Sequence, residues 1–501
     1  MRSSRGSSRI APALLALVVA AGCTRAAPAT APKPNPRVER VLTSDLDRIF
    51  GAQLTSNALW GVQIKSLETG RVLYSRNAAT LMMPASNMKI VTLAAAAETL
   101  GWDYRFKTTL ETSAPIEDGV LKGDLVVRGT GDPTINRRDG RGTAVFDEWA
   151  AALKAAGIRQ IEGGILGDGS AFDDRRLGQG WAWDYLEAGY AAPVGALEYN
   201  ENIATVSIRA GAKPGDAAEL QLSPGTGLGL LYHVVTGAPG SRTTITLERR
   251  TYDNYLDVSG SIAVDAAAVT RDVAVVSPSS YFAQSLLSGL VDRGILVTRP
   301  SRDISERAQD VENPPRRVLH ETVSPPLRDI ATTMMKVSQN LYAETLLKAS
   351  GAAKGGPGTA ASGRRASSDV FTAWGIPESS YVQADGSGLS RYDYVTAAMI
   401  VTLLERMHSN PRHREAFVAT LPIAGKDGTI STRLRTTRAE GNAVAKTGSI
   451  SNVRALSGYV RTRDGELLAF SILANNFTAP AATITWMADL AVETLANHTT
   501  R

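Results

Sequence analysis

Apolar and polar positions follow two different periods after residue 37. Residues 38–54 predict a helix, because the apolar positions fall on one side at helical spacing: Leu42, Leu46, Ile49 and Phe50. Residues 60–66 and 71–75 instead alternate at a period of two, and the turn-forming residues 67–70 separate them. This pattern predicts a helix followed by a β-hairpin.

A second helix is predicted directly after the hairpin. The run 91–100 is rich in Ala and Leu, and Gly101 is a typical stop signal. Ser86 and Lys89 lie at its start, three positions apart, which places both on one helix face. A neutral amine there could take the serine proton, and the helix dipole favours developing negative charge. Alone, however, a Ser-x-x-Lys pattern occurs by chance in a chain this long, and a solvated Ser and Lys is the default interpretation.

From residue 103 to 300 the pattern changes to short strand-like runs separated by Gly, Asp and Pro turns. Two helical segments, 146–156 and 281–294, interrupt these runs. We expect an inserted β-rich region of two lobes, one formed by 103–202 with 267–300 and the other by 203–266.

Helical spacing returns after Pro325 and Pro326. The apolar stripe consists of Leu327, Ile330, Met334, Val337 and Leu341. Ser338 and Asn340 fall within it, and positions two apart do not share a helix face. If both side chains serve one site, the helix must break between them.

The rest of the chain predicts a loose Gly-rich loop at 351–363, a tight turn at 385–390 and a helix at 395–407. Lys446, Thr447 and Gly448 lie within the segment 443–450, and taken alone they are compatible with a strand that enters a turn. A hairpin with an Asp464–Gly465 turn follows, formed by 455–462 and 466–474. A closing amphipathic helix is expected at 481–496.

The first 22 residues have the pattern of a secretory signal peptide, with a basic start and an apolar run at 10–21 that is too short to span a bilayer. Cys23, the only cysteine, follows directly and resembles the lipidated cysteine of bacterial lipoproteins, although Ala20 replaces the usual Leu. An ordinary signal peptide cut nearby is the alternative. Residues 23–40 are rich in Pro and Ala and predict an extended tether.

Composition limits the classes of function. With 501 residues, 43% hydrophobic and 21% charged, the chain suits a globular protein of two or more domains. Loss of the three arginines in the signal segment lowers the formal net charge from +5 to +2, and no basic block with interleaved aromatics appears, so nucleic acid is not expected as a partner. The five histidines are scattered and predict no metal site, and no G-x-S-x-G elbow is present.

Three short motifs occur in this order along the chain: Ser86-x-x-Lys89, Ser338-x-Asn340 and Lys446-Thr447-Gly448. Each is weak alone, but the ordered set is specific. This set resembles the active-site serine penicillin-recognising enzymes. About 250 residues separate the first two motifs, a gap similar to that of the class C low-molecular-mass penicillin-binding proteins, the D-alanyl-D-alanine carboxypeptidase/endopeptidase family. The resemblance covers roughly residues 40–495 and extends to further stretches: 123–125, 129–133, 192–197, 200–202 and 385–390. Many relatives carry Asp where Gln339 stands.

The resemblance implies an α+β fold. A β-lactamase/transpeptidase-like domain, an antiparallel sheet flanked by helices, would be formed by residues 41–102 and 301–501 and split by the β-rich insertion 103–300. It also implies an exported enzyme of the periplasm or cell envelope that acts on peptidoglycan stem peptides, uses no cofactor and is acylated by β-lactams. It would contact a membrane only through a lipid on Cys23.

The resemblance further implies roles for the motif residues. Ser86 would attack the carbonyl between two D-alanines, with Lys89 as its base, and burial together with a neighbouring Lys446 would lower the pKa of Lys89. Ser338 would relay a proton between Lys446 and the leaving amine, and Asn340 would bind the acyl-side peptide. Lys446 and Thr447 would hold the terminal carboxylate of the substrate. Gly448, which has no side chain, would let the substrate lie along the strand. The backbone N–H groups of Ser86 and Ser449 would form the oxyanion hole.

The sequence leaves several alternatives open. A β-lactamase would need a fast deacylation base, and none is identifiable. A non-catalytic wall-binding lipoprotein would be expected to have lost one motif, whereas all three are present. Which lysine is the base, the balance between carboxypeptidase and endopeptidase activity, and the oligomeric state are not determined by the sequence.

Overall fold

The computed structural model describes residues 36–138, 140–250, 253–306 and 314–499. The predicted signal peptide, Cys23 and most of the predicted tether therefore lie outside the described residues. The first helix, α1 (Pro36–Phe50), begins within the segment 23–40. The expectation of an extended tether is wrong for 36–40, where the amphipathic helix has already started.

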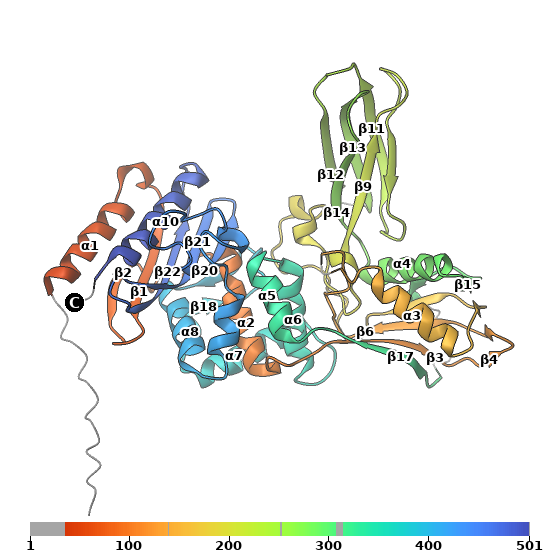
Figure 1. The fold of residues 1–501 in the computed structure, drawn as a ribbon, viewed down its shortest axis with the longest axis horizontal. Coiled ribbons are helices and arrows are strands. Elements are labelled where there is room, and N and C mark those ends of the chain that lie inside the picture. Colours follow the sequence, from red (N-terminus) through yellow and green to blue (C-terminus); the bar gives the residue numbers. More distant parts are fainter. Residues whose placement is uncertain (1–35, 139, 251–252, 307–313, 500–501) are drawn as a thin grey trace, which may run out of the picture.

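One five-stranded antiparallel sheet organises the region that contains both ends of the described chain (Figure 1). Its strand order is β2 (Val72–Arg76), β1 (Leu59–Ser66), β22 (Leu467–Asn475), β21 (Val453–Arg461) and β20 (Val444–Ile450). The predicted hairpins are therefore confirmed. They pair with each other through β1 and β22, which joins the two ends of the sequence in one sheet.

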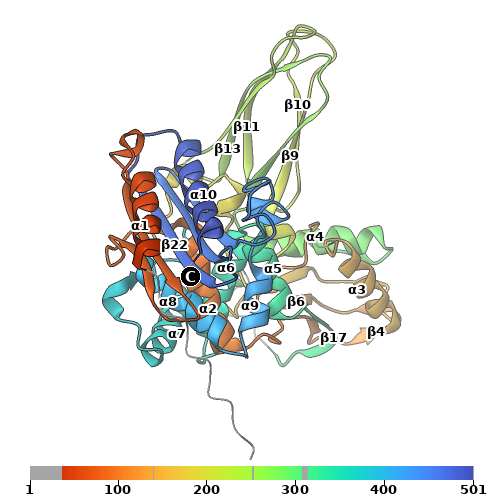
Figure 2. The same ribbon diagram turned by 60° about the vertical axis from the view of Figure 1, so that its left-hand side comes forward.

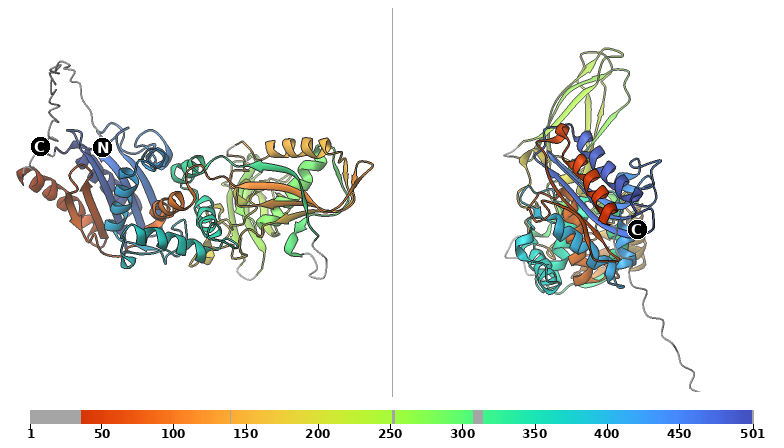
Figure 3. Two further views of the ribbon diagram at one scale, coloured as in Figure 1. Left: turned by 90° about the horizontal axis from the view of Figure 1, so that it is seen from below. Right: turned by 90° about the vertical axis from the view of Figure 1, so that its left-hand side faces the viewer.

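Strand β22 shows how this sheet is buried on both faces. Leu468, Phe470 and Ile472 pack into one core with α1 and with α10 (Ala481–Asn497), the two helices that cover one face of the sheet (Figure 3). Ala469 and Leu473, which alternate with them, pack into the opposite core. Successive side chains of a strand point to opposite faces, so a nearly continuous apolar run is what a doubly covered strand requires.

The opposite face carries a group of helices around α2 (Met88–Leu100), whose residues 88–97 are all buried. A helix that is apolar all round belongs inside a domain, and the four alanines 94–97 allow its neighbours to approach closely. Gly101 ends α2 with a φ of 82°. The neighbouring helices in this region are α5 (Leu327–Lys336), α6 (Asn340–Ala352), α7 (Ala360–Ala373), α8 (Ala397–Ser409) and α9 (Arg414–Thr420).

The predicted loose loop at 351–363 is wrong at both of its ends, whereas 353–359 do connect two helices without being helical. Gly351 belongs to α6 and Gly363 to α7. A Cβ on Gly363 would lie 2.1 Å from the backbone oxygen of Leu347, so this glycine serves the close packing of the two helices. Glycines that we expected to make a flexible loop instead allow two helices to pack closely.

The inserted region contains a mixed five-stranded sheet in the order β16 (Arg302–Asp303), β8 (Ile165–Asp168), β6 (Leu125–Gly129), β3 (Lys107–Thr112) and β17 (Arg317–Val323). A smaller sheet lies beside it: β15 (Leu296–Val297), β7 (Gln160–Ile161), β5 (Val120–Leu121) and β4 (Ile116–Glu117). Helices α3 (Ala144–Ala155) and α4 (Pro278–Asp292) share their core through the stacked rings of Trp149 and Phe282.

A second lobe projects away from the rest of the molecule (Figure 2). It consists of two three-stranded sheets. One has the order β10 (Glu219–Leu222), β9 (Ile203–Arg209), β14 (Val269–Ala274), and the other has the order β11 (Gly229–Gly237), β13 (Tyr255–Ala263), β12 (Thr244–Arg249).

Two pairings differ from the expected boundaries. Strand β17 pairs with β3, so the inserted sheet includes residues beyond 300, and β14 pairs with β9, so the projecting lobe includes residues beyond 266. We propose that the inserted region spans 103–323 and its projecting lobe 203–274. Among the described helices, none has the length and apolar composition needed to cross a membrane.

Candidate active site

Ser86 lies in a single 3-10 turn, Ala85–Asn87, that leads into α2. The amine of Lys89, one turn further along, donates to Ser86 Oγ at 3.0 Å. The same amine donates to Asn340 Oδ1 at 2.6 Å and to the backbone oxygen of Ser387 at 2.8 Å. Lys89 Nζ therefore connects the start of α2 to Asn340 and to Ser387, two residues distant in the sequence, directly beside the serine hydroxyl.

The expected break between Ser338 and Asn340 is confirmed. Helix α5 ends at Lys336, Ser338 adopts a φ of 62°, and α6 begins at Asn340. Gln339 caps α6, because its side chain accepts from the N–H of Leu341 at 3.1 Å. An Asp at this position could accept the same hydrogen bond, which gives a physical reason why the middle residue of the motif varies.

Lys446 meets the broken helix from the edge strand β20. Its amine donates to Ser338 Oγ and to the backbone oxygen of Thr447, both at 2.8 Å. Thr447 Oγ1 in turn donates to Thr429 Oγ1 at 2.7 Å, and Ser449 is exposed one step further along the strand. The strand thus presents an amine and hydroxyl groups along one edge of the site.

Gly448 holds β20 against the serine turn. A Cβ at this position would lie 2.6 Å from the backbone oxygen of Pro84 and 3.1 Å from the backbone nitrogen of Ser86. The absence of a side chain is therefore required by contact within the protein, a reason that the sequence did not reveal. The three motifs meet in one place because β20 packs on the turn that contains Ser86.

Burial changes the basicity of Lys89. The side chain is fully buried, and burial lowers its pKa from the ordinary 10.5 to about 7. The negative charges of Asp385, Glu344 and Asp393 act in the opposite direction and limit the decrease. The expectation that the neighbouring lysine helps to lower the pKa of Lys89 is not what the structure indicates.

Lys446 is also fully buried, and burial lowers its pKa well below 10.5. The nearby charge of Lys89 adds to this decrease, so the like-charge effect acts on Lys446. Each amine contacts its own serine hydroxyl, Lys89 that of Ser86 and Lys446 that of Ser338. A pKa of about 7 allows Lys89 to take and give up a proton near neutral pH, which an ordinary lysine cannot do.

A set of buried carboxylates holds the loop behind Lys89. Glu344 accepts from the N–H groups of Gly386 at 3.0 Å and Ser387 at 2.8 Å. Asp385 accepts from Gly388 at 2.7 Å, and Asp393 accepts from the N–H of Asp385 at 3.2 Å. These bonds fix the backbone oxygen of Ser387 where it accepts the proton of Lys89.

Sequence reasoning missed Glu344, Asp393 and the contacts supplied by the inserted region. Burial raises the pKa of Glu344 to about 8, and it raises the pKa of Asp393 well above its ordinary value. Glu344 lies four residues after Asn340 and so shares its helix face, which is a signal that could have drawn attention to it. The backbone oxygen of Tyr190 accepts from Asn340 Nδ2 at 2.8 Å, so the insertion also completes the site.

Comparisons with known proteins agree over nearly the whole chain. A model of the D-Ala-D-Ala carboxypeptidase 3 (S13) family matches residues 42–496. The chain is 35% identical to the D-alanyl-D-alanine carboxypeptidase of Actinomadura sp. (strain R39), over 95% of this chain and 89% of that protein. It is 28% identical to D-alanyl-D-alanine carboxypeptidase DacB of Haemophilus influenzae, over 88% and 90% of the two chains.

Solved structures give the same result. The crystal structure of penicillin binding protein 4 (dacB) from Haemophilus influenzae matches with a TM-score of 0.79 at 27% identity, over 91% of this chain and 99% of that one. A complex of the same protein with a novel β-lactam matches with a TM-score of 0.71 at 26% identity, over 89% and 97% of the chains. The match to the family model extends over far more than half of the sequence, so this chain belongs to the D-Ala-D-Ala carboxypeptidase 3 (S13) family.

Proposed function

We propose that the protein is a serine D-alanyl-D-alanine carboxypeptidase that acts on peptidoglycan stem peptides through an acyl-enzyme, can also cut D-alanyl cross-links, and is acylated by β-lactams. The observation that carries this proposal is the position of the Lys89 amine, 3.0 Å from Ser86 Oγ, with a pKa lowered to about 7. Membership of the S13 family and similarity to enzymes named D-alanyl-D-alanine carboxypeptidase support the choice of substrate.

Acylation follows from these contacts. Ser86 Oγ attacks the carbonyl carbon of the penultimate D-alanine while its proton passes to the neutral amine of Lys89. The C–N bond of the tetrahedral intermediate then breaks, and the leaving amine takes a proton from Ser338, which Lys446 replaces through their 2.8 Å hydrogen bond. Water hydrolyses the resulting ester, which frees the shortened peptide and restores the serine hydroxyl.

Recognition is assigned to the edge of β20 and to Asn340. Lys446 and Thr447 bind the terminal carboxylate of the substrate, Asn340 binds the acyl-side peptide, and the backbone N–H groups of Ser86 and Ser449 bind the oxyanion. The burial-lowered pKa of Lys446 has a consequence here, because an incoming carboxylate favours the charged form of this amine. Binding of the carboxylate thereby supplies the proton donor that the leaving amine needs.

The decisive experiment is labelling with a fluorescent penicillin. The wild type should form a stable adduct whose labelled peptide contains Ser86, and Ser86→Ala should not label. Ser56→Ala, in an exposed loop, is the matched control and should label normally. Rapid turnover of the penicillin would indicate a β-lactamase, and an intact Ser86→Ala adduct would show that the nucleophile is another residue.

We also propose export to the periplasm or cell envelope, with removal of residues 1–22 as a signal peptide and lipidation of Cys23. The support is the basic and apolar pattern of that segment and the small residues that precede the cysteine. Recovery of the full-length protein only in the soluble fraction would count against the lipid anchor and would leave the enzyme assignment unaffected.

A further inference from the structure

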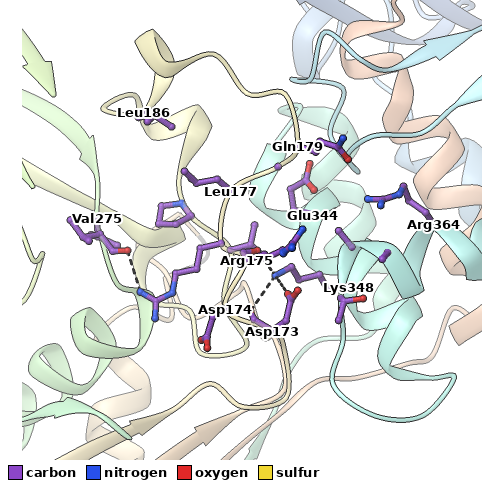
Figure 4. A pocket seen from close by; sticks show the side chains of 18 of the residues that line it. Asp173, Asp174, Arg175, Leu177, Gln179, Leu186, Val275, Glu344, Lys348 and Arg364 are labelled. Carbon is purple, nitrogen blue, oxygen red and sulfur yellow. Dashed lines mark hydrogen bonds and ion pairs between the residues drawn. The ribbon is translucent and has the colours of Figure 1, made fainter. Parts of the chain in front are cut away.

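A cavity of about 820 Å³ lies where the helical region meets the inserted region (Figure 4). Its walls come from α6 and α7, from the chain segment 173–179 after β8, and from Arg249 at the end of β12. None of the predicted site residues lines it. We name it the interdomain cavity.

The lining carries more cations than anions. Its basic side chains are Arg175, Arg176, Arg249, Arg364 and Lys348. Two of them are already paired, because Lys348 contacts Asp173 at 2.6 Å and Arg176 contacts Asp303 at 3.3 Å. The other three arginines have no carboxylate partner within 4 Å among the residues that the structure describes.

These three arginines come from three separate segments. The Arg175 side chain is exposed and its guanidinium makes no hydrogen bond to any described residue. Figure 4 shows it among the other lining side chains, with Arg364 of α7 pointing toward it. Arg364 donates to the backbone oxygen of Ala384 at 3.2 Å, and Arg249 donates to that of Leu186 at 3.3 Å. Arg249 also donates to Asn254 Oδ1 at 3.3 Å. Its partial burial lowers its pKa, the charge of Glu187 opposes that decrease, and an anionic ligand would oppose it further.

The opposing acids do not cancel this charge. Asp173 is paired, and Asp174 is exposed to solvent. Glu344 is buried and its oxygens already accept hydrogen bonds from the loop N–H groups of Gly386 and Ser387. The interdomain cavity therefore offers a net positive charge to whatever enters it.

Apolar side chains line the same space: Leu177, Leu186, Pro193, Val194, Val275 and Val276. A ligand that uses the whole lining must carry both anionic groups and small apolar groups. A volume of this size suits a ligand of a few amino-acid residues. A peptide with several carboxylates and alanine methyl groups meets these requirements better than a phosphate polymer does, because a polyphosphate would leave the apolar wall without a partner.

We propose that the interdomain cavity is a second binding site that holds an uncleaved wall peptide with at least two carboxylates, through Arg175, Arg249 and Arg364. The choice of a wall peptide as the ligand rests on the proposed function. The inference that the site binds an anion rests only on the residues that line the cavity. Such a site would hold a second peptidoglycan strand near the one that reacts at Ser86.

The test uses full-length protein whose Ser86 has been acylated with benzylpenicillin, so that the catalytic site is closed. The probe is the tripeptide L-Ala-γ-D-Glu-L-Lys, which lacks the cleavable D-alanines, and binding is measured by calorimetry. We expect binding at a ratio of one peptide to one protein, and at least about tenfold weaker binding when the peptide carboxylates are amidated, since tenfold in affinity is about 1.4 kcal/mol.

Variants then locate the site. Arg175→Ala should weaken tripeptide binding about tenfold and the double variant Arg175→Ala with Arg364→Ala about a hundredfold, whereas Arg365→Ala, exposed on the same helix, should have no effect. The rate of penicillin acylation shows that each variant is folded, and it tests the catalytic proposal separately. No binding to the acylated protein, equal binding of the amidated peptide, no loss in Arg175→Ala, or preferential binding of poly(glycerol phosphate) would each overturn the proposal.

Discussion

The pH dependence of acylation provides the sharpest test of the site, because it depends on the buried amine of Lys89. A pKa of about 7 means that roughly one amine in eleven is neutral at pH 6 and roughly ten in eleven are neutral at pH 8. If neutral Lys89 takes the proton of Ser86, the rate should rise about tenfold between these two values and then level off. An ordinary lysine with a pKa of 10.5 would instead give a rise that continues to pH 10.

The quantity to measure is the second-order rate constant for acylation by a fluorescent penicillin, between pH 5.5 and pH 9.5. Thr447→Val serves as the control, because Thr447 does not contact Lys89 and its loss should lower the rate without moving the inflection. Glu344→Gln should move the inflection to lower pH, since the charge of Glu344 favours the protonated form of Lys89. Gln keeps an oxygen that can accept from Gly386 and Ser387.

One result would refute this reasoning about Lys89. A rate that keeps rising about tenfold per pH unit between pH 8 and pH 9.5 would mean that the amine is charged at neutral pH. Burial would then not have lowered the pKa of Lys89 to about 7, and the assignment of a neutral Lys89 as the base at neutral pH would be wrong.

Four further predictions concern Lys89, Thr447, Gly448 and Cys23. Lys89 should contribute a rise in the free energy of unfolding of up to about 1.4 kcal/mol per pH unit between pH 7 and pH 10, because it is then protonated only in the unfolded chain. Urea titrations should show a smaller rise in Lys89→Met than in the wild type, with a remainder from the buried Lys446. Thr447→Val should lower kcat/KM about ten- to hundredfold for a D-Ala-D-Ala peptide but not for its amidated form, and equal losses on both would contradict the carboxylate clamp. Gly448→Ala should slow penicillin acylation and lower stability by about 1–3 kcal/mol, measured by urea unfolding, because its Cβ would meet Pro84 and the Ser86 turn. Cys23→Ser should release the protein from membranes in a fractionation experiment if the lipid anchor exists.

The sequence was sufficient to predict the elements around the site, because local pattern decides them. The period-two runs give β1, β2 and the β21–β22 hairpin, and the Ala-rich run gives α2. The break at Ser338 was predictable for a different reason: two residues needed in one site cannot both point there from a regular helix. Each of these inferences needs only residues that are close together in the chain.

The sequence could not assign sheet partners or the boundaries of the insertion. Strand β17 pairs with β3, although about 200 residues separate the two strands in the chain. No local pattern specifies such a partner, so the expected boundary at 300 left out the strand that pairs with β3. The same limit applies to Gly363, whose function depends on the position of Leu347 on the neighbouring helix.

The properties that make Lys89 reactive also depend on the tertiary structure. Its motif identifies it as a candidate, but its pKa results from complete burial opposed by the charges of Asp385, Glu344 and Asp393. No motif marked Glu344 or Asp393. Glu344 acts only because the loop 385–388 folds over it and places the Ser387 oxygen against the Lys89 amine. Retention of the three motifs in a sequence is therefore not sufficient to conclude that it is active. A chain that kept Ser86, Lys89 and Lys446 but lost the acceptor at position 344 would leave the buried N–H of Gly386 without a partner and that of Ser387 with Asp385 alone, and the loop that positions the base would have to rearrange.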